Sequence, residues 1–272
     1  MFSVADCTSI INQLLPEPHA GLLSGIVFGV KANLDPALTQ ALITTGTLHI
    51  VALSGMNITI LTTMVNKSLL WLIPKTRAGL ISIILIVGFI LFVGPSPSVV
   101  RAGIMGAISS VGLYAGKPVL GLWSWGLAVV AMLIMKPAWI TELSFQLSVL
   151  ASLGMILFGK AQTPVFACNR TFIEKIKETI TGDLHTTLAA QTLTIPLLFV
   201  TFGRLSLISP LTNVLIVWTL PALTVLGFLV VTGGLIFFPV GQIFAWVAWI
   251  FLEYLIRVIM LTSALPFASW QW

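Results

Sequence analysis

The segment HIVALSGMN, at residues 49–57, carries side chains that could do chemistry in an unexpected place. It puts His49, Ser54, Gly55 and Asn57 inside an apolar run, TLHIVALSGMNITILTTMV, that is long enough to cross a membrane. A serine and a histidine can act as a nucleophile and its base when they touch. Five residues of α-helix, however, separate two side chains by about 140°. His49 and Ser54 therefore cannot hydrogen-bond directly, and the pair does not predict a hydrolase.

Other motifs for catalysis or cofactor binding are also missing from the sequence. It has no G-x-S-x-G motif and no glycine-rich phosphate-binding loop. The three histidines, His19, His49 and His185, have no metal-ligand spacing. Cys7 and Cys168 are either free thiols or one disulfide, and the sequence leaves both open. We therefore expect no enzymatic activity, no metal and no cofactor.

The composition is that of a membrane protein. Hydrophobic residues make up 58% of the 272 residues, charged residues make up 8%, and the mean hydropathy is +1.08. Soluble domains carry about 25% charged residues. We therefore expect an all-α, polytopic transmembrane bundle of about eight spans with broken or re-entrant helices. The predicted spans are 47–66, 78–94, 99–116, 118–135, 138–158, 184–202, 209–236 and 242–264.

The first 46 residues are predicted to differ from the rest of the chain. We expect residues 1–46 to be an extracytoplasmic or interfacial segment with a short apolar helix, a turn at residues 33–36 and an amphipathic helix. Residues 47–272 then form the transmembrane channel-type part, and the whole chain is a single membrane domain. With the N-terminus outside, the cytoplasmic loops hold eight lysines and arginines and the outer side holds three. This bias places both termini outside the cytoplasmic membrane.

Several predicted spans contain residues that break helices. GPSPS at residues 94–98 separates two spans with almost no loop, and Pro196 and Pro221 lie within spans. Gly55 can unwind the first span. Backbone groups freed by such breaks must face protein or a water-filled cavity. The pattern is more typical of a channel or transporter than of a membrane anchor.

Polar side chains in three of the spans favour a shared polar path. These are His49, Ser54 and Asn57 in the first span, Gln146 in the fifth, and Thr187, Gln191 and Thr194, which form a narrow stripe, in the sixth. Each of them can instead make an ordinary hydrogen bond between helices. We expect His49, Asn57, Gln146 and Gln191 to converge on one polar cavity.

Three arginines complete the set of polar positions. Arg257 lies four residues after Glu253, so the two can pair on one face of the last span. Arg101 follows the break at residues 94–98, where it either snorkels to the outer interface or lines the mouth of a pore. Arg204 is expected on the outer side.

Five segments, taken in order, resemble one known family. They are LLPEPHAGLLSGIVFG (14–29), TTGTLHIVALSGMNITIL (44–61), PSVVRAGIMGAISSVGLYAGKP (97–118), ELSFQLSVLASLGMILFG (142–159) and TTLAAQTLTIPLLFVTFGRLSLISPLTNVLIV (186–217). Their combination is similar to the competence domain of the ComEC family, the inner-membrane DNA-uptake channel of natural transformation. The resemblance extends from about residue 14 to residue 235.

The resemblance implies that the chain imports single-stranded DNA across the cytoplasmic membrane. It also implies an extracytoplasmic DNA receptor, a cytoplasmic motor ATPase and, besides the lipid bilayer, a separate nuclease as partners. The residues at the family's motif positions are His49, Ser54, Gly55, Arg101, Phe145, Gln146, Gln191 and Asn213.

The sequence departs from the family pattern at three points. Asn57 stands where the family usually has a second histidine, and Arg204 replaces a residue that is often uncharged. Full-length members also carry an OB-like module before this domain and a metallo-β-lactamase-like nuclease module after it, and neither is recognisable here. We therefore expect a channel core without the nuclease, or a part of a split or longer protein.

We expect the path to be lined by His49, Ser54, Asn57, Arg101, Gln146, Thr187, Gln191 and Arg204. Neutral hydrogen-bonding groups can replace phosphate hydration without holding a polyanion tightly, and Arg101 and Arg204 could attract DNA at the outer mouth. Two alternatives remain. One is a secondary transporter of a small anionic solute, which needs a coupling carboxylate in mid-membrane. The other is a non-conducting membrane scaffold, in which the polar positions face different neighbours.

Overall fold

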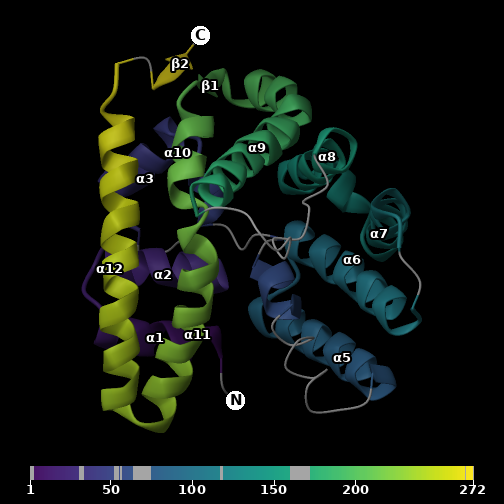
Figure 1. Cartoon of the computed structure of the whole chain (residues 1–272), viewed down its shortest axis with the longest axis horizontal. Coiled ribbons are helices and arrows are strands. Elements are labelled where there is room, and N and C mark those ends of the chain that lie inside the picture. The colour runs from purple at the N-terminus through teal and green to yellow at the C-terminus, as the bar shows by residue number, and fades with distance from the viewer. Residues whose placement is uncertain are drawn as a thin grey trace.

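In a computed structural model, the chain folds as a bundle of helices with one two-stranded β-ribbon (Figure 1). The residues described are 3–30, 34–51, 55, 57–63, 75–116, 119–159, 172–266 and 268–271, with the backbone alone at 75–78, 113–114, 172–180, 202, 204–205 and 270–271. The helices are α1 (Val4–Leu14), α2 (His19–Phe28), α3 (Pro36–Thr44), η1 (Leu48–Ile50), α5 (Lys75–Val93), α6 (Pro97–Tyr114), α7 (Gly121–Met135), η2 (Pro137–Thr141), α8 (Leu143–Phe158), α9 (Phe172–Phe202), α10 (Ser209–Ile216), α11 (Thr219–Ile236) and α12 (Phe238–Ser263). Residues 57–63 are also helical. The strands are β1 (Arg204–Ser206) and β2 (Ser269–Gln271).

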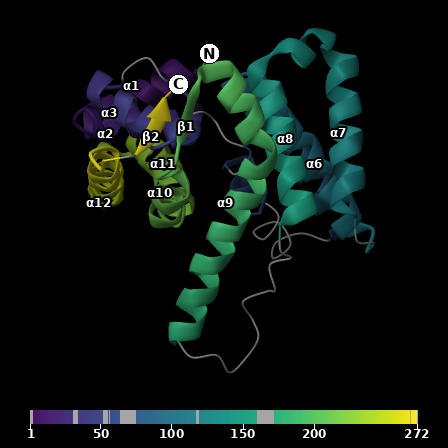
Figure 2. The same cartoon turned by 90° about the horizontal axis from the view of Figure 1, so that it is seen from above.

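The helices form two groups with α9 between them (Figures 1 and 2). In the first, which we call the terminal group, α1 and α2 run across the long pair α11 and α12, and α3 and α10 lie towards one end of that pair. The second, the middle group, consists of α5–α8. Figure 2 shows α9 with α10 on one side and α8 on the other. This helix is therefore placed to connect the two groups.

The core of the terminal group is built around α2. All ten residues of α2 are buried, as its sequence HAGLLSGIVF, with one histidine and one serine, allows. Glycines on α11 let the N-terminal helices approach closely. A Cβ atom on Gly227 would lie 2.4 Å from Val27 Cγ2 of α2, and one on Gly234 would lie 2.7 Å from Ile10 Cγ2 of α1. Larger residues at these two positions would push the N-terminal helices away from α11.

The N-terminal 46 residues pack as part of this group. The sequence did not predict α1, which begins at a capping box formed by Ser3 and Asp6. The two helices expected around a turn at residues 33–36 are present as α2 and α3, but α2 is buried within the bundle. Gln242 of α12 also donates a hydrogen bond to the Leu14 carbonyl, at 3.2 Å. Residues 1–46 therefore pack on α11 and α12, and their extracytoplasmic or interfacial placement stays a prediction.

The middle group has a smaller core and packs on α9 through α8, which approaches α9 most closely at a glycine. Trp125 of α7 donates from Nε1 to the Val149 carbonyl of α8, at 3.2 Å. A Cβ atom on Gly154 of α8 would lie 2.3 Å from the Ala189 carbonyl oxygen of α9, so only glycine fits between these two helices. The buried cluster of this group consists of Val100, Met132, Trp139 and Phe145. Phe145, a motif position, is therefore a packing residue.

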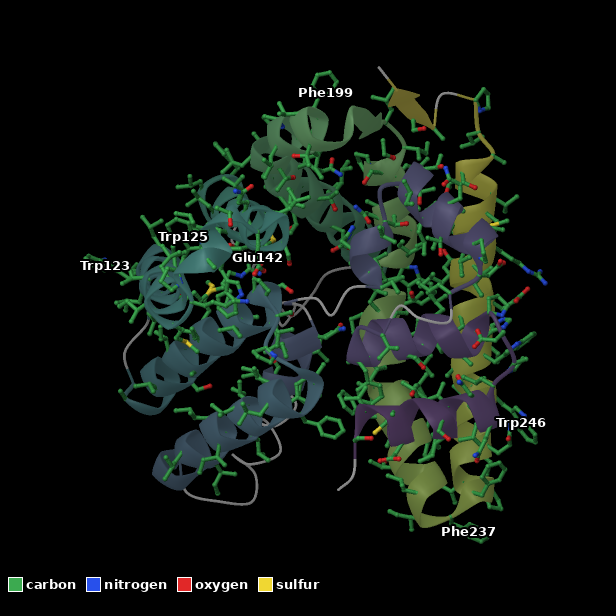
Figure 3. The ribbon with its side chains drawn as sticks, turned by 180° about the vertical axis from the view of Figure 1, so that it is seen from behind. Trp123, Trp125, Glu142, Phe199, Phe237 and Trp246 are labelled. Carbon is green, nitrogen blue, oxygen red and sulfur yellow. The ribbon has the colours of Figure 1, made fainter. Side chains whose placement is uncertain are left out.

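Large apolar side chains project from the outside of both groups, as expected for a membrane protein (Figure 3). Trp123 of α7 is 69% exposed and Trp246 of α12 is 64% exposed. Within the described residues, three helical stretches are long and apolar enough to cross a membrane: 181–201, 219–236 and 238–263. The apolar helices at 19–28, 79–93, 121–135 and 143–158 are shorter. The helical bundle is confirmed, and the count of eight spans stays a prediction.

The predicted helix breaks have different outcomes. The break after the second span is confirmed, because α5 ends at Val93 and α6 begins at Pro97. The seventh span is broken between α10 and α11, which places Pro221 in the first turn of α11, where proline is tolerated. The predicted break at Pro196 is wrong, since α9 continues through it. A proline removes one backbone hydrogen bond, and a helix of 31 residues packed on α8 tolerates this loss.

A short ribbon ties the end of the described chain to the segment after α9. β1 and β2 pair antiparallel, with Leu205 opposite Trp270. The Ala268 carbonyl also accepts hydrogen bonds from the backbone N–H groups of Leu207 and Ile208, at 3.1 and 3.4 Å. Arg204, a predicted path residue, forms part of β1, and its side chain lies outside the described residues.

Candidate functional site

The described parts of residues 45–63 contact helices of both groups, namely α2, α10 and α11 of the terminal group and α6 of the middle group. We call residues 45–63 the central segment. Its described parts are residues 45–51, Gly55 and the short helix 57–63, and Ser54 lies outside them. Gly46 packs against the start of α10, Gly55 packs against α6, and Asn57 is bonded to α2 and α11. The segment that drew attention in the sequence is therefore a hub of the packing.

The first contact of the central segment is a polar junction, which consists of Gly46, His49, Gln191, Ser209 and Asn213. Gly46 has a positive φ of 67°, and a Cβ atom there would lie 3.0 Å from both Cβ and Oγ of Ser209. The Ser209 hydroxyl accepts a hydrogen bond from Gln191 Nε2 of α9 at 2.9 Å and from Asn213 Nδ2 at 3.5 Å. The junction thus joins α9, α10 and the central segment through neutral groups.

His49 presents an unfilled nitrogen at this junction. Its Nδ1 lies 3.1 Å from the Gly46 carbonyl oxygen. A carbonyl can only accept, so Nδ1 carries the proton, and Nε2 of the neutral ring is an acceptor without a hydrogen-bond partner among the described residues. The side chain is exposed. Asn213, by contrast, is buried, and its Oδ1 has no partner in the described part of the chain. The junction therefore keeps hydrogen-bonding capacity that the protein itself does not use.

The polar stripe of α9 faces the junction. Thr187 and Gln191 lie about 180° around the helix from Ala189, the residue whose carbonyl packs against Gly154 of α8. Because Gln191 reaches Ser209 of α10, this polar face is turned from the middle group towards the terminal group. Thr187 is half-buried and lies one turn before Gln191. Thr187 and Gln191 thus share one face of α9, as helical periodicity requires, and the path along the stripe of Thr187, Gln191 and Thr194 stays a prediction.

Asn57 has a different role from the one that we expected. It is 4% exposed, and its Nδ2 donates to the Ile26 carbonyl near the C-terminal end of α2. Its Oδ1 accepts a hydrogen bond from Thr224 Oγ1 of α11 at 3.3 Å. Beside it, Val51 fills the space over Gly25 of α2. Asn57 therefore holds the central segment to the terminal group.

Arg101 is also buried, and its expected place at a pore mouth or at the membrane interface stays a prediction. The side chain is 9% exposed, and its Nη1 donates to the Ser148 carbonyl of α8. A Cβ atom on Gly55 would lie 2.9 Å from Arg101 Nη2. Gly55, which is itself helical, thus leaves the space in which the guanidinium sits. Arg101 therefore connects α6, α8 and the central segment inside the bundle.

Gln146 lies apart from these contacts. Its Nε2 donates to the Ile140 carbonyl of η2 at 2.9 Å. Among the described residues, no hydrogen bond joins any two of His49, Asn57, Gln146 and Gln191. His49 and Gln191 lie on either side of the contact between Gly46 and Ser209, while Asn57 and Gln146 bond elsewhere, and the convergence of all four on one cavity stays a prediction. The prediction assumed one α-helix from His49 to Asn57, but residues 48–50 form a 3₁₀ turn, which changes the phase.

Sequence reasoning missed two residues of this region, Ser209 and His19. Ser209 begins α10 in the motif SPLTN, where a serine is typical of a helix start, so nothing marked it as a hub. His19 Nε2 lies 2.9 Å from Glu253 Oε2, and its ring stacks on Trp249. The predicted pair of Glu253 and Arg257 is confirmed, with Arg257 Nε 2.6 Å from Glu253 Oε1. This cluster anchors the start of α2 to α12.

The described residues offer no metal centre, since no three His, Cys, Asp or Glu side chains among them are grouped to hold an ion. The comparison with protein families is more informative. The family described as "Competence protein" matches residues 26–272. The chain belongs to this family. The family membership predicted from five segments of the sequence is thereby confirmed.

Two relatives show how much of a longer protein the chain corresponds to. It is 25% identical over 210 residues to "ComE operon protein 3" of Bacillus subtilis (strain 168), a match that covers 77% of this chain and 26% of that protein. It is 28% identical over 255 residues to "Competence protein ComA" of Neisseria gonorrhoeae, which covers 88% of this chain and 33% of that protein. The chain thus spans a third or less of these competence proteins. No solved structure matches it significantly.

Proposed function

We propose that the chain forms the core of a membrane channel that imports single-stranded DNA across the cytoplasmic membrane during natural transformation. The observation that carries the proposal is the polar junction, where neutral side chains of α9 and α10 share a hydrogen-bonded hydroxyl and Gly46 of the central segment packs against it. The names of the two relatives, a ComE operon protein and a competence protein, point to the same process.

The chemistry of the polar junction suits the passage of a polyanion. The amide of Gln191 and the ring of His49 can exchange hydrogen bonds with phosphates, sugars and base edges. Because they carry no fixed charge, they replace hydration without holding each phosphate tightly, as conduction requires. Thr187 extends this lining by one turn of α9. We infer that the strand passes along the polar face of α9.

The proposal includes a topology and a set of partners. The protein crosses the cytoplasmic membrane several times, with both termini outside. An extracytoplasmic receptor delivers the DNA, a cytoplasmic motor ATPase draws the strand inward, and a separate nuclease removes the other strand. The chain itself needs no enzymatic activity in this scheme, because strand removal and force both come from its partners.

The alternative of a solute transporter is weakened by the surroundings of Glu253. A coupling carboxylate must exchange its proton as the transporter changes conformation. Glu253, the carboxylate on α12, is bonded to both His19 and Arg257, so it already has two partners within the chain. The scaffold alternative predicts that Gln191 matters for stability alone, and the following experiment separates it from a channel.

The test compares two glutamines that each donate one hydrogen bond between helices. Gln191→Leu removes the hydrogen bond to Ser209 at the polar junction. Gln242→Leu removes the hydrogen bond to the Leu14 carbonyl, which is not part of the polar junction. Each variant is expressed in a transformable host that lacks its own family member and retains the receptor, motor and nuclease. The measurement is uptake of labelled DNA, divided by the amount of protein in the membrane.

We expect Gln242→Leu to retain uptake per molecule and Gln191→Leu to lower it about tenfold, the effect of losing one well-placed hydrogen bond. Equal uptake per molecule for the two variants would support the scaffold. A wild-type chain that restores no uptake at all would contradict the channel.

A further inference from the structure

Arg101 carries a buried charge that the described protein leaves without a counter-ion. The side chain is 9% exposed, and its one hydrogen bond within the described residues goes to a neutral group, the Ser148 carbonyl. Its Nε is buried and has no partner among those residues. Among the described residues, the ion pairs involve His19, Lys136 and Arg257, and none involves Arg101. Burying an unpaired charge is costly, so this position is suited to an anion from outside the chain.

The surroundings of Arg101 are built to receive such an anion. The Ser148 hydroxyl is also buried without a partner, in the same residue whose carbonyl accepts from Arg101. That carbonyl is already shared, since Ser152 Oγ donates to it at 2.9 Å. On the other side, Gly55 leaves room for Arg101 Nη2, which a Cβ atom would crowd at 2.9 Å. Within the described part of the chain, two buried and unpartnered polar groups, the Arg101 Nε–H and the Ser148 hydroxyl, thus belong to two residues that are hydrogen-bonded to each other.

We propose that Arg101 and the Ser148 hydroxyl bind one backbone phosphodiester of the passing DNA strand, inside the bundle. This inference rests on the proposed function and deepens it, because it names the group of the substrate that this site takes. A phosphodiester carries one negative charge and two free oxygens, which match one guanidinium N–H and one hydroxyl. Each nucleotide brings an identical phosphodiester, so the site is sequence-independent and is refilled at every step of the strand.

The phosphate of a lipid headgroup has the same chemistry, and the position of Arg101 favours the strand. Its guanidinium lies between α6, α8 and Gly55 of the central segment, not on the exposed face of either helix. The central segment also carries His49 of the polar junction. The phosphate site and the polar junction are therefore two contacts of the same stretch of chain.

The experiment measures binding of oligonucleotides to the purified full chain in nanodiscs of phosphatidylcholine. One probe is a fluorescent single-stranded oligothymidylate, and a second has the same sequence with an uncharged methylphosphonate backbone. We expect Arg101→Gln to weaken binding of the charged probe roughly tenfold and to leave the neutral probe unchanged. The slope of log affinity against log salt should fall by about 0.7, the value for one phosphate contact to a single strand. Arg101→Lys should recover part of the loss.

Ser148→Ala serves as the second variant, since it removes the hydroxyl and leaves the carbonyl that holds Arg101. It should weaken the charged probe roughly threefold to tenfold, and it decides the matter if Arg101→Gln does not fold. Equal losses for both probes, or no change in salt slope, would mean a purely structural arginine and would overturn the inference. A lipid control completes the test. If phosphatidylglycerol raises the Tm of wild type but not of Arg101→Gln, and the substitution does not change oligonucleotide binding, the site binds lipid. That result would also overturn the inference. A wild-type chain that binds neither probe would refute the proposed function itself.

Discussion

Replacing Asn57 with alanine should loosen the central segment from the terminal group by a measurable amount. The Ile26 carbonyl belongs to the last turn of α2, where carbonyls lack helical partners, and no described backbone N–H donates to it. Asn57→Ala leaves this buried carbonyl unpaired, which costs about 1–3 kcal/mol. Thr224 loses little, because its hydroxyl also donates to the Leu220 carbonyl at 2.8 Å. A loss of about 2 kcal/mol corresponds to a fall in Tm of about 4–8 °C.

The assay is thermal unfolding of the purified protein in detergent, followed by tryptophan fluorescence. Thr224→Val is the matched control, since it removes the 3.3 Å hydrogen bond to Asn57 Oδ1, worth about 0.6 kcal/mol between membrane helices, together with the local bond to the Leu220 carbonyl, and leaves the bond from Asn57 to the Ile26 carbonyl in place. Asn57→His keeps an N–H donor and should retain more stability than Asn57→Ala. An alanine variant as stable as wild type, or equal shifts for Asn57→Ala and Thr224→Val, would refute the assignment of Asn57 as the tie to α2.

Two further substitutions test the packing around the site. Gly154→Ala should lower the free energy of unfolding by about 1–3 kcal/mol, because the added methyl group collides with the α9 backbone. In Gly126→Ala the new methyl group meets nothing within 4 Å, so this control should stabilise α7 slightly. The Tm of the two variants should therefore move in opposite directions. Glu253→Gln should lower Tm, since it removes the charged partner of buried His19, while Glu142→Gln, in a pair exposed to solvent, should have almost no effect. A Glu253→Gln protein as stable as Glu142→Gln would show that the cluster does not anchor α2.

Local features of this protein could be predicted from its sequence because they depend on helical periodicity. Glu253 and Arg257 are four residues apart on one helix, and they pair as expected. Thr187 and Gln191 share one face of α9 for the same reason. The break between α5 and α6 follows from prolines that cannot continue a helix. These predictions needed no knowledge of the tertiary structure.

The contacts of the candidate site could not be predicted in this way, because its partners are distant in sequence. Asn57 bonds to residues 31 and 167 positions away, and His19 meets Glu253 across 234 positions. The burial of Arg101 depends on a glycine from another segment that leaves room for it. The sequence suggested that Arg101 lies at the membrane interface or at the mouth of a pore. It does not show which neighbouring residues provide the space and the hydrogen-bond acceptor for a buried guanidinium.

The central claim, that a DNA strand passes along the polar face of α9, can be tested by site-specific photo-crosslinking. p-Benzoylphenylalanine is placed at Thr187, on that face, or at Trp123, which points away from α7 on the outside of the middle group (Figure 3). Transformable cells take up a labelled single strand whose trailing end carries a bulky protein, so that the strand stalls within the channel. The account predicts a protein–DNA adduct on illumination at Thr187 and none at Trp123. Equal adduct yields at both positions would contradict the account. So would the lack of an adduct at Thr187 while the stalled strand remains protected from external nuclease.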